Sequence, residues 1–337
     1  MKILHFGAGK IGRGLVFPFF REQHDITLAD RNTELVRSIR ENRGYNVIEL
    51  DYERQCIITI PDPPIRTFTE LLDLHDMDVI TTSVIVSNLV AIAPYIGDIA
   101  KNNKRPLYII PMENSLEAVD ILKRELLSTL HDLDGIYFLG SVIDRIVPAT
   151  KNALDIECEK YYSIKIENCN GFGELLKDES VLSENIYKEF DKKFLLVNGL
   201  HACAAYLGYL RGHEYICDVM EDKIARSKLD RLGECYIQYL MSVYGFKEDE
   251  LIPYFNNTLV RFANPSIKDP LGRVGRNLLI KLSPTDRIYR PLLFNKRNGL
   301  NYKPLEEIVE AAREFKIAND YDQYLLYLHD REPSEML

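Results

Sequence analysis

Short apolar runs alternate with helix-length segments through the first half of the chain. This alternation predicts the buried strands of an open, largely parallel sheet with helices between them. The runs that fit are Lys2–Phe6, Asp25–Ala29, Val47–Glu49, Cys56–Ile60, Val79–Thr82, Leu107–Pro111 and Ile136–Ile143. Apolar and polar residues then alternate over Leu154–Glu159 and Tyr162–Glu167, which predicts two more strands, antiparallel at the sheet edge or at a domain junction.

The pattern changes after about residue 185. From there apolar residues recur at helical spacing over Phe194–Tyr209, Ile216–Tyr244 and Leu305–Phe315. This change predicts an α/β domain over residues 1–185 and a mostly α-helical domain over residues 186–337.

Composition narrows the class of protein. The chain has 337 residues, of which 46% are hydrophobic and 28% charged, a formal net charge of −9, and no polybasic tail. These features favour a cytoplasmic globular enzyme and argue against nucleic acid as a partner. Composition does not give the oligomeric state, and a monomer or weak homo-oligomer is expected. No apolar run approaches the roughly 20 residues that cross a bilayer, and the chain starts with a predicted strand instead of a signal sequence, so we expect no membrane association.

A glycine-rich turn follows the first predicted strand. Gly7, Gly9 and Gly12 have the G-x-G-x-x-G spacing that lets a backbone approach a pyrophosphate at the start of a helix. The second predicted strand ends in Asp30, where an acid is expected for the ribose hydroxyls. We therefore predict a Rossmann-type, doubly wound N-terminal domain that binds a dinucleotide. The alternative is a domain that has kept the turn without binding one.

The predicted cofactor is NAD. Asp30 would repel the 2′-phosphate of NADP, although the adjacent Arg31 leaves some room for it. The residues predicted to bind the cofactor are Phe6, Gly7, Ala8, Gly9, Lys10, Ile11, Gly12, Arg13, Asp30, Arg31 and Thr82.

Three residues able to handle protons recur along an apolar segment of the second domain. At about 100° per helical residue, Asn198 lies about 140° and His201 about 80° from Lys193, so one broad side of a helix carries all three. Desolvation there would lower the pKa of the lysine and make it a usable general base. The alternative is an ordinary amphipathic helix with a solvated lysine and a core histidine.

Polar residues follow two of the predicted strands, at Glu113–Asn114 and Asp144–Arg145. Ligands of open α/β sheets bind beyond the carboxyl ends of the strands, so we expect both pairs to face the crevice of the glycine turn. The alternatives are a helix N-cap for Asn114 and a surface salt bridge for Asp144 and Arg145.

Arginine and lysine residues cluster between Arg261 and Arg290, and this cluster includes Arg273, Arg276 and Lys281. Arginine binds phosphate through paired hydrogen bonds, so a cluster that faces a cleft would recognise a phosphorylated substrate. The alternative is a solvated or salt-bridged basic face.

Cysteine and histidine spacing predicts no metal site. The six cysteines include no Cys-x-x-Cys pair, and the seven histidines form no His-Glu-x-x-His motif. Reduced thiols are therefore expected, and no metal. If the chain is a dehydrogenase, a side chain must accept the proton.

Together these motifs resemble those of the long-chain, metal-independent polyol dehydrogenases, in particular the mannitol-1-phosphate 5-dehydrogenase branch. The resemblance extends from residue 2 to about residue 315. It is carried by GAGKIGRG at residues 7–14, EN at 113–114, DRIVP at 144–148, the Lys193, Asn198 and His201 set, and RVGR, KLS and DR within residues 273–287.

The resemblance implies an oxidoreductase that interconverts D-mannitol 1-phosphate and D-fructose 6-phosphate with NAD. Lys193 matches the general acid/base, Asn114 and Asn198 match the residues that polarise the reacting oxygen, and His201 matches the residue that positions the substrate. The residues that match the substrate site are Asp144, Arg273, Arg276 and Lys281. An arginine at position 276 suits a phosphorylated substrate.

The chain departs from the family's pattern in places. Lys10 stands where the family often has Asn, residues 81–86 stand where relatives tend to carry Gly-Pro, and the chain ends soon after Phe315. These departures predict an altered cofactor loop and a more open substrate pocket. Two other functions stay open: a reductase of keto-uronates such as fructuronate or tagaturonate, and a non-catalytic dinucleotide-binding sensor.

Overall fold

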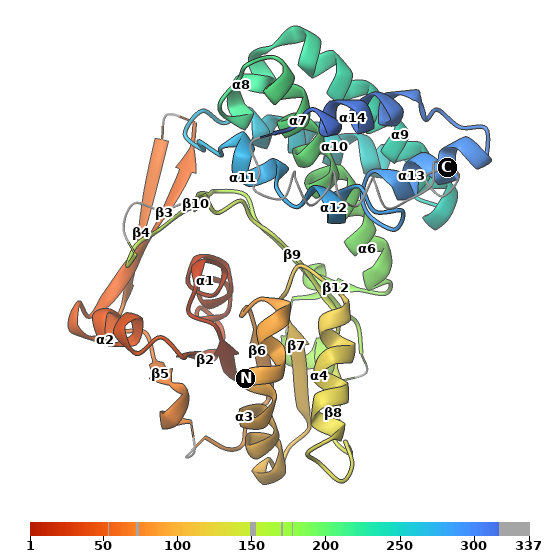
Figure 1. Cartoon of the computed structure of the whole chain (residues 1–337). Coiled ribbons are helices and arrows are strands. Elements are labelled where there is room, and N and C mark those ends of the chain that lie inside the picture. The colour runs from red at the N-terminus through yellow and green to blue at the C-terminus, as the bar shows by residue number, and fades with distance from the viewer. Residues whose placement is uncertain (53, 72–73, 149–152, 170, 177, 317–337) are drawn as a thin grey trace. The chain divides into compact units, whose positions relative to one another are not determined.

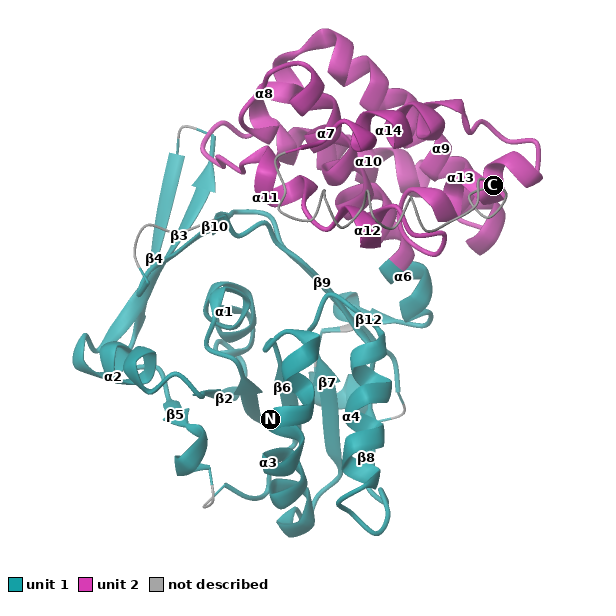
Figure 2. Cartoon of the chain, in the orientation of Figure 1, with its two compact units in different colours: residues 1–190 teal, residues 191–337 magenta. Residues whose placement is uncertain are grey.

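The computed structural model describes residues 1–316 except 53, 72–73, 149–152, 170 and 177. The chain divides into two compact units, residues 1–190 and 191–337, which Figure 2 distinguishes by colour. The predicted shortened tail lies outside the described residues.

The first unit is built on a six-stranded parallel sheet (Figure 1). Its strand order is β5-β2-β1-β6-β7-β8, and every neighbouring pair is parallel. This order is the 3-2-1-4-5-6 of a doubly wound dinucleotide-binding fold, so the predicted fold class of this unit is confirmed. The strands are β1 (Lys2–Phe6), β2 (Asp25–Asp30), β5 (Ile65–Thr67), β6 (Val79–Thr82), β7 (Leu107–Pro111) and β8 (Ile136–Phe138).

Alternate side chains of β1 enter two different cores. Ile3 packs on the face covered by η1, α1 and α2, whereas Leu4 and Phe6 pack on the face covered by α3 and α4. Strand side chains point alternately to opposite faces, so a strand covered on both faces is a continuous apolar run. The covering helices are η1 (Gly12–Val16), α1 (Phe17–Phe20), α2 (Thr33–Glu41), α3 (Leu89–Asn102) and α4 (Glu117–Leu127).

Two predicted strands of the main sheet form a separate hairpin instead. β3 (Gly44–Asp51) and β4 (Arg54–Pro61) pair antiparallel, and β10 (Ile156–Glu159) pairs parallel with β3. Only residues 52–53 separate β3 from β4, and a parallel crossover needs about a dozen or more. The prediction that these strands join the parallel sheet was therefore wrong.

The strand predicted over residues 136–143 is two strands in two sheets. Leu139 still donates its N–H to Ile109 of β7 at 3.0 Å, but Gly140 already accepts from Glu167 at 2.9 Å. The chain thus changes partners between β8 and β9 (Ser141–Asp144). β11 (Ser163–Glu167) pairs antiparallel with β9 and parallel with the short β12 (Leu182–Ser183). These strands form a separate sheet, and β10 pairs parallel with β3, so the predicted antiparallel pair at the edge of the main sheet was wrong.

The second unit is helical, as predicted. α7 (Leu200–Leu210) is buried along almost its whole length and packs against α8, α9, α11 and α14. The other helices are α6 (Ile186–Lys193), which crosses the division between the units, η5 (Phe194–Gly199), α8 (Ile216–Glu221), α9 (Lys223–Tyr244), α10 (Glu248–Phe262), α11 (Leu271–Gly275), α12 (Leu278–Lys281), α13 (Tyr289–Arg297) and α14 (Lys303–Arg313). None of the described helices has the length and hydropathy of a membrane span.

The single helix predicted over Ile216–Tyr244 is broken at Asp222. The carboxylate of Asp222 accepts hydrogen bonds from the N–H groups of Ile224 at 2.9 Å and Ala225 at 3.2 Å. An aspartate with extended backbone satisfies the unpaired donors of a helix start, so α9 begins there as a new helix.

Candidate functional site

The glycine turn lies where the strand order reverses, between β1 and β6. Gly7 has a φ of 110°, and a Cβ there would lie 2.6 Å from the carbonyl oxygen of Ser83. A Cβ at Gly12 would lie 1.9 Å from the carbonyl oxygen of Gly7. Both positions therefore require glycine. A Cβ at Gly9 would meet nothing within 4 Å, so this part of the turn faces open space that a ligand can approach.

A cavity of about 380 Å³ adjoins the turn within the first unit. Of the predicted cofactor residues, those that line it are Gly7, Gly9, Lys10, Ile11, Asp30 and Arg31. The opposite wall includes Ser83, Val84 and Ile85 of the predicted cofactor loop, and four residues that were not predicted: Phe68, Asn88, Ala91 and Ile92. These residues carry no local motif, and only the topology of the sheet brings them to the turn.

Asp30 holds the turn through its carboxylate. Its two oxygens accept the backbone N–H groups of Ala8 at 2.7 Å and Asn32 at 2.8 Å. A carboxylate offers about four acceptor positions, so these two bonds leave capacity for hydroxyl donors from the cavity.

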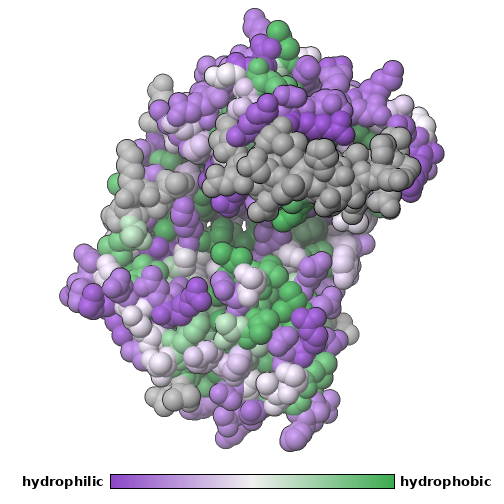
Figure 3. All heavy atoms as spheres, viewed as in Figure 1, coloured by the Kyte–Doolittle hydropathy of each residue, from purple (hydrophilic) through white to green (hydrophobic). Residues whose placement is uncertain are grey.

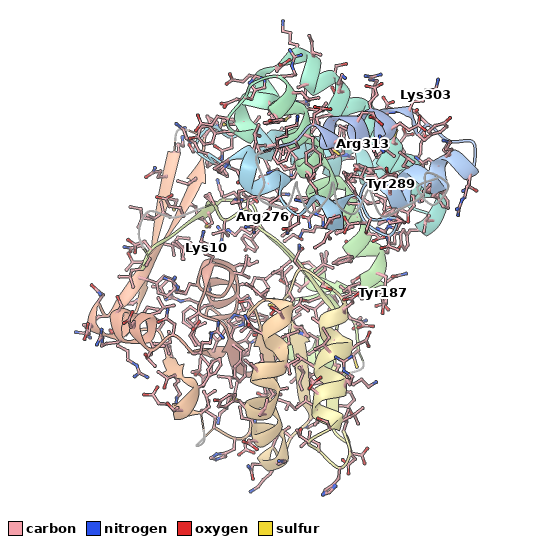
Figure 4. The ribbon with its side chains drawn as sticks, in the orientation of Figure 1. Lys10, Tyr187, Arg276, Tyr289, Lys303 and Arg313 are labelled. Atoms are coloured by element: carbon pink, nitrogen blue, oxygen red, sulfur yellow. The ribbon has the colours of Figure 1, made fainter. Side chains whose placement is uncertain are left out.

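Two basic residues of the turn differ in position. Lys10 lines the cavity and donates from Nζ to the carbonyl oxygen of Pro148 at 2.8 Å (Figure 4). Arg13 is buried and donates to the carbonyl oxygens of Ala8 at 2.7 Å, Ala153 at 2.9 Å and Leu154. Arg13 therefore braces the turn from behind and is not among the residues that line the cavity.

A buried histidine beneath the turn was not predicted. His5 bonds through Nδ1 to the Thr81 hydroxyl at 2.7 Å and through Nε2 to the Ser83 hydroxyl at 2.9 Å. Burial lowers the pKa of His5 to about 3, so the ring is neutral at physiological pH. The Ser83 hydroxyl reaches the Gly7 carbonyl oxygen at 3.3 Å, which links this network to the turn.

The two polar pairs that follow strands are not explained by the simpler alternatives. The N-cap position of α4 is Leu116, and the Ser115 hydroxyl accepts the Glu117 N–H at 3.3 Å, while Asn114 lies two residues before the cap and is exposed. Asp144 and Arg145 are both buried, and Arg145 pairs with Glu49 at 2.5 Å instead of forming a surface salt bridge.

In the second unit, Lys193 ends α6 and is only 9% exposed, so the alternative of a solvated lysine is wrong. The π-helical η5 follows, in which Leu200 donates its N–H to Leu195, five residues earlier. Asn198 lies in this wide segment. It follows Lys193 by about one helical turn, whereas in an α-helix the two side chains would point about 140° apart. Segments of this kind occur often at functional sites.

His201 lies in α7 above Phe262, with ring centroids 4.7 Å apart. Its Nε2 is 3.5 Å from the carboxylate of Asp269, whose side chain is 2% exposed. Burial lowers the pKa of His201 to about 4, Asp269 opposes this effect, and the nearby cations of Arg273, Lys281 and Arg261 add to it. His201 is therefore neutral near pH 7. Asp269 was not predicted.

The predicted basic cluster is divided by its contacts. Arg273 forms a paired salt bridge with Asp269, including an Nε–Oδ1 distance of 2.7 Å. Lys281 is buried and donates to the carbonyl oxygens of Val274, at 2.5 Å, and Arg276. Arg276 itself is exposed on the segment between α11 and α12 (Figure 4). The cluster thus contains the kind of salt bridge that the alternative interpretation predicted, between Arg273 and Asp269, and it leaves Arg276 exposed.

Among the residues that the structure describes, no group of three or more His, Cys, Asp and Glu side chains is arranged to hold a metal ion. The sulfur atoms of the six cysteines form no disulfide.

Two family models match the chain, one in each unit. The mannitol dehydrogenase Rossmann domain matches residues 1–177, and the mannitol dehydrogenase C-terminal domain matches residues 185–335.

Similar proteins agree with these matches. A mannitol-1-phosphate 5-dehydrogenase of Caldanaerobacter subterraneus is 33% identical over 319 residues, which cover 89% of this chain and 82% of that protein. A mannitol-1-phosphate 5-dehydrogenase of Aspergillus niger is 30% identical over 336 residues, which cover 94% of this chain and 86% of that protein. Among solved structures, Pseudomonas fluorescens mannitol 2-dehydrogenase in ternary complex with NAD and D-mannitol has a TM-score of 0.73 at 16% identity, with 93% and 78% of the chains covered. At that identity the likeness concerns the fold.

Proposed function

The chain belongs to the mannitol dehydrogenase family, and from this premise we propose that it interconverts D-mannitol 1-phosphate and D-fructose 6-phosphate with NAD. Family membership makes it an oxidoreductase. The observation that carries the proposal is the buried Lys193, followed after one wide helical turn by Asn198 and then by the neutral His201.

NAD is the cofactor, and the cavity of the first unit is its site. The open space at Gly9 suits a pyrophosphate at the start of the following helix, and the remaining acceptor positions of Asp30 suit ribose hydroxyls. Phe68 and Ile92 supply apolar surface for a flat ring. When bound, NAD supplies the hydride acceptor.

Lys193 handles the proton. The neutral amine takes the proton of the substrate hydroxyl as that carbon gives up its hydride, and the hydroxyl becomes a carbonyl. In the reverse direction the ammonium returns the proton. The amide of Asn198, on the helical segment that directly follows Lys193, donates to the oxygen while it carries negative charge, and such a donor contributes about 3 kcal/mol in a dry site. His201, being neutral, positions the substrate through hydrogen bonds.

The far end of the substrate is bound by cationic side chains. Arg276 is exposed, and Lys281 fixes the backbone on which it stands by bonding its carbonyl oxygen. An arginine so held can bind a phosphate through two hydrogen bonds. A carboxylate would fit the same fork, so a keto-uronate is the competing substrate class.

The deciding experiment is NADH oxidation by the purified protein with fructose 6-phosphate, and with fructose, fructuronate and tagaturonate under the same conditions. We expect turnover with fructose 6-phosphate, and an increase of KM for it by at least about tenfold in Arg276→Ala. The matched control is Arg297→Ala, also exposed and at the end of α13. Turnover with a keto-uronate alone would contradict the proposed substrate.

A further inference from the structure

We propose that Glu113 is a positioning residue for the cofactor, because its carboxylate holds the loop after β6 so that Ile85 stands over the dinucleotide cavity. The inference rests on the proposed function and gives a specific role to a residue beside the predicted catalytic Asn114. Both Glu113 and the loop belong to the first unit.

Three donors of the loop converge on this one carboxylate. Oε1 of Glu113 accepts the Thr82 hydroxyl at 2.9 Å and the Val84 N–H at 2.8 Å, and Oε2 accepts the Ile85 N–H at 3.1 Å. Glu113 is only 6% exposed. Burial raises the pKa of Glu113, and the same three donors oppose that rise. Hydrogen bonds to the loop are therefore the interactions that compensate the buried charge.

The loop is held in a conformation that its sequence disfavours. Ile85 has φ 72° and ψ 135°, although a β-branched residue rarely adopts a positive φ. Such backbone persists only where surrounding contacts impose it, and it occurs most often at ligand sites. The hydrogen bond from the Ile85 N–H to Glu113 fixes the backbone before the Ile85 Cα. On the other side, Asn88 donates its N–H to the Ile85 carbonyl at 2.8 Å and its amide to the Val84 carbonyl at 2.6 Å.

The conformation leaves an apolar side chain at the cavity. Ile85 lines the cavity yet is 70% exposed. Figure 3 shows apolar side chains gathered over the beginning of α3, where Val90 is also 50% exposed. Neither the fold of the first unit nor its cores require this exposure. A bound dinucleotide would cover Ile85, and the gain in buried apolar area would strengthen binding.

The test replaces the acceptor without changing its shape. In Glu113→Gln, an NH2 group replaces one of the two oxygens that receive the loop's donors, so at least one donor loses its acceptor. We expect the Kd of NADH, followed by its fluorescence without substrate, to rise about tenfold, while kcat at saturating NADH and fructose 6-phosphate changes less than about twofold. Glu117→Gln, an exposed carboxylate in the first turn of α4, is the matched control and should change neither.

A second variant separates backbone strain from simple contact. Glycine tolerates a positive φ, so in an Ile85→Gly background the loop needs no clamp and Glu113→Gln should raise Kd less than about twofold. An unchanged Kd in Glu113→Gln, even with a lower Tm, would overturn the inference. A full tenfold rise in Kd caused by Glu113→Gln in the Ile85→Gly background would also overturn it. The same holds if the wild-type protein does not bind NADH. If the wild-type protein binds NADH but does not turn over fructose 6-phosphate, the proposed substrate fails and the positioning role is still decided by Kd.

Discussion

At the scale of single residues, burial decides which groups can move protons. His5 and His201 are neutral because burial lowers their pKa to about 3 and about 4. Lys193 is only 9% exposed and immediately precedes the helical segment that continues into His201. A neutral imidazole at His201 adds no positive charge to this part of the helical unit.

Lys193→Ala should lower kcat by roughly a thousandfold, because general base catalysis contributes factors of this order. The Kd of NADH should stay unchanged, because the predicted NADH cavity is lined by residues of the first unit. The neighbouring Lys192, whose Nζ lies 5.4 Å and 5.3 Å from the ring centroids of Phe246 and Tyr254, provides the control. Lys192→Ala should keep kcat within about threefold. Equal losses in both variants would point to unfolding instead of catalysis.

Acid should destabilise the protein partly through His201. Its pKa is about 4 when folded and 6.5 when exposed, so between these values the unfolded chain binds more protons. The free energy of unfolding contributed by this group is therefore complete above pH 6.5 and declines as the pH falls to about 4, by at most roughly 3 kcal/mol. Urea unfolding at pH 7 and pH 4.5 should show a smaller decline in His201→Gln than in the wild type. An equal decline of the free energy of unfolding in His201→Gln and in the wild type would refute this role of His201.

At the scale of elements, close helix packing depends on small residues. Gly233 of α9 faces Phe255 of α10, and a Cβ at this glycine would lie 2.3 Å from the ring. Gly233→Ala should lower the free energy of unfolding by about 1–3 kcal/mol, as overpacking does. Adding Phe255→Leu should recover part of the loss, because the two residues are in contact. Chemical denaturation of the three variants measures both effects, and strictly additive losses would contradict the contact.

The elements best predicted from sequence were those with a strong local pattern. β1, β2, β6 and β7 carry buried residues on both sides because both faces of the sheet are covered, and the glycine turn was recognised from its spacing. The predicted strands 47–49 and 56–60 were shorter than the observed β3 and β4. Their antiparallel pairing was missed, since pairing depends on the length of the connection. Apolar periodicity cannot reveal the single extra residue of η5.

Site residues that act through distant contacts could not be predicted. Glu113 was noted only as the neighbour of Asn114, because the loop it binds lies about thirty residues earlier in the chain. His5 and Asp269 likewise acquire their roles from Ser83 and His201, which are far away in sequence. Such partners become neighbours only when the sheet or the helical unit is assembled.

At the scale of the whole molecule, cofactor and proton chemistry are assigned to different units. NADH at a concentration of 100 times Kd should raise the free energy of unfolding of the part that binds it by about 2.7 kcal/mol. Thermal unfolding should show this stabilisation in Lys193→Ala as in the wild type. NADH should not stabilise Gly12→Ala, because the added Cβ would collide with the Gly7 carbonyl oxygen and distort the turn that binds the cofactor.

The proposed chemistry uses a lysine and needs no metal ion. Activity should therefore survive exhaustive treatment with a chelator such as EDTA, measured as NADH oxidation before and after dialysis. Loss of activity that zinc restores would overturn this mechanism.

The π-helical segment Phe194–Gly199 has an evolutionary consequence. Such a segment equals an α-helix with one residue inserted, and deleting one residue would return the chain to ordinary helical spacing. Everything from His201 onward would then be rotated relative to Lys193 by about 100°. The loss of a single codon here would thus change which side chains share a face of the helix, although every side chain that carries the proposed chemistry would be kept. The length of this segment therefore matters to the geometry as much as the identity of its residues.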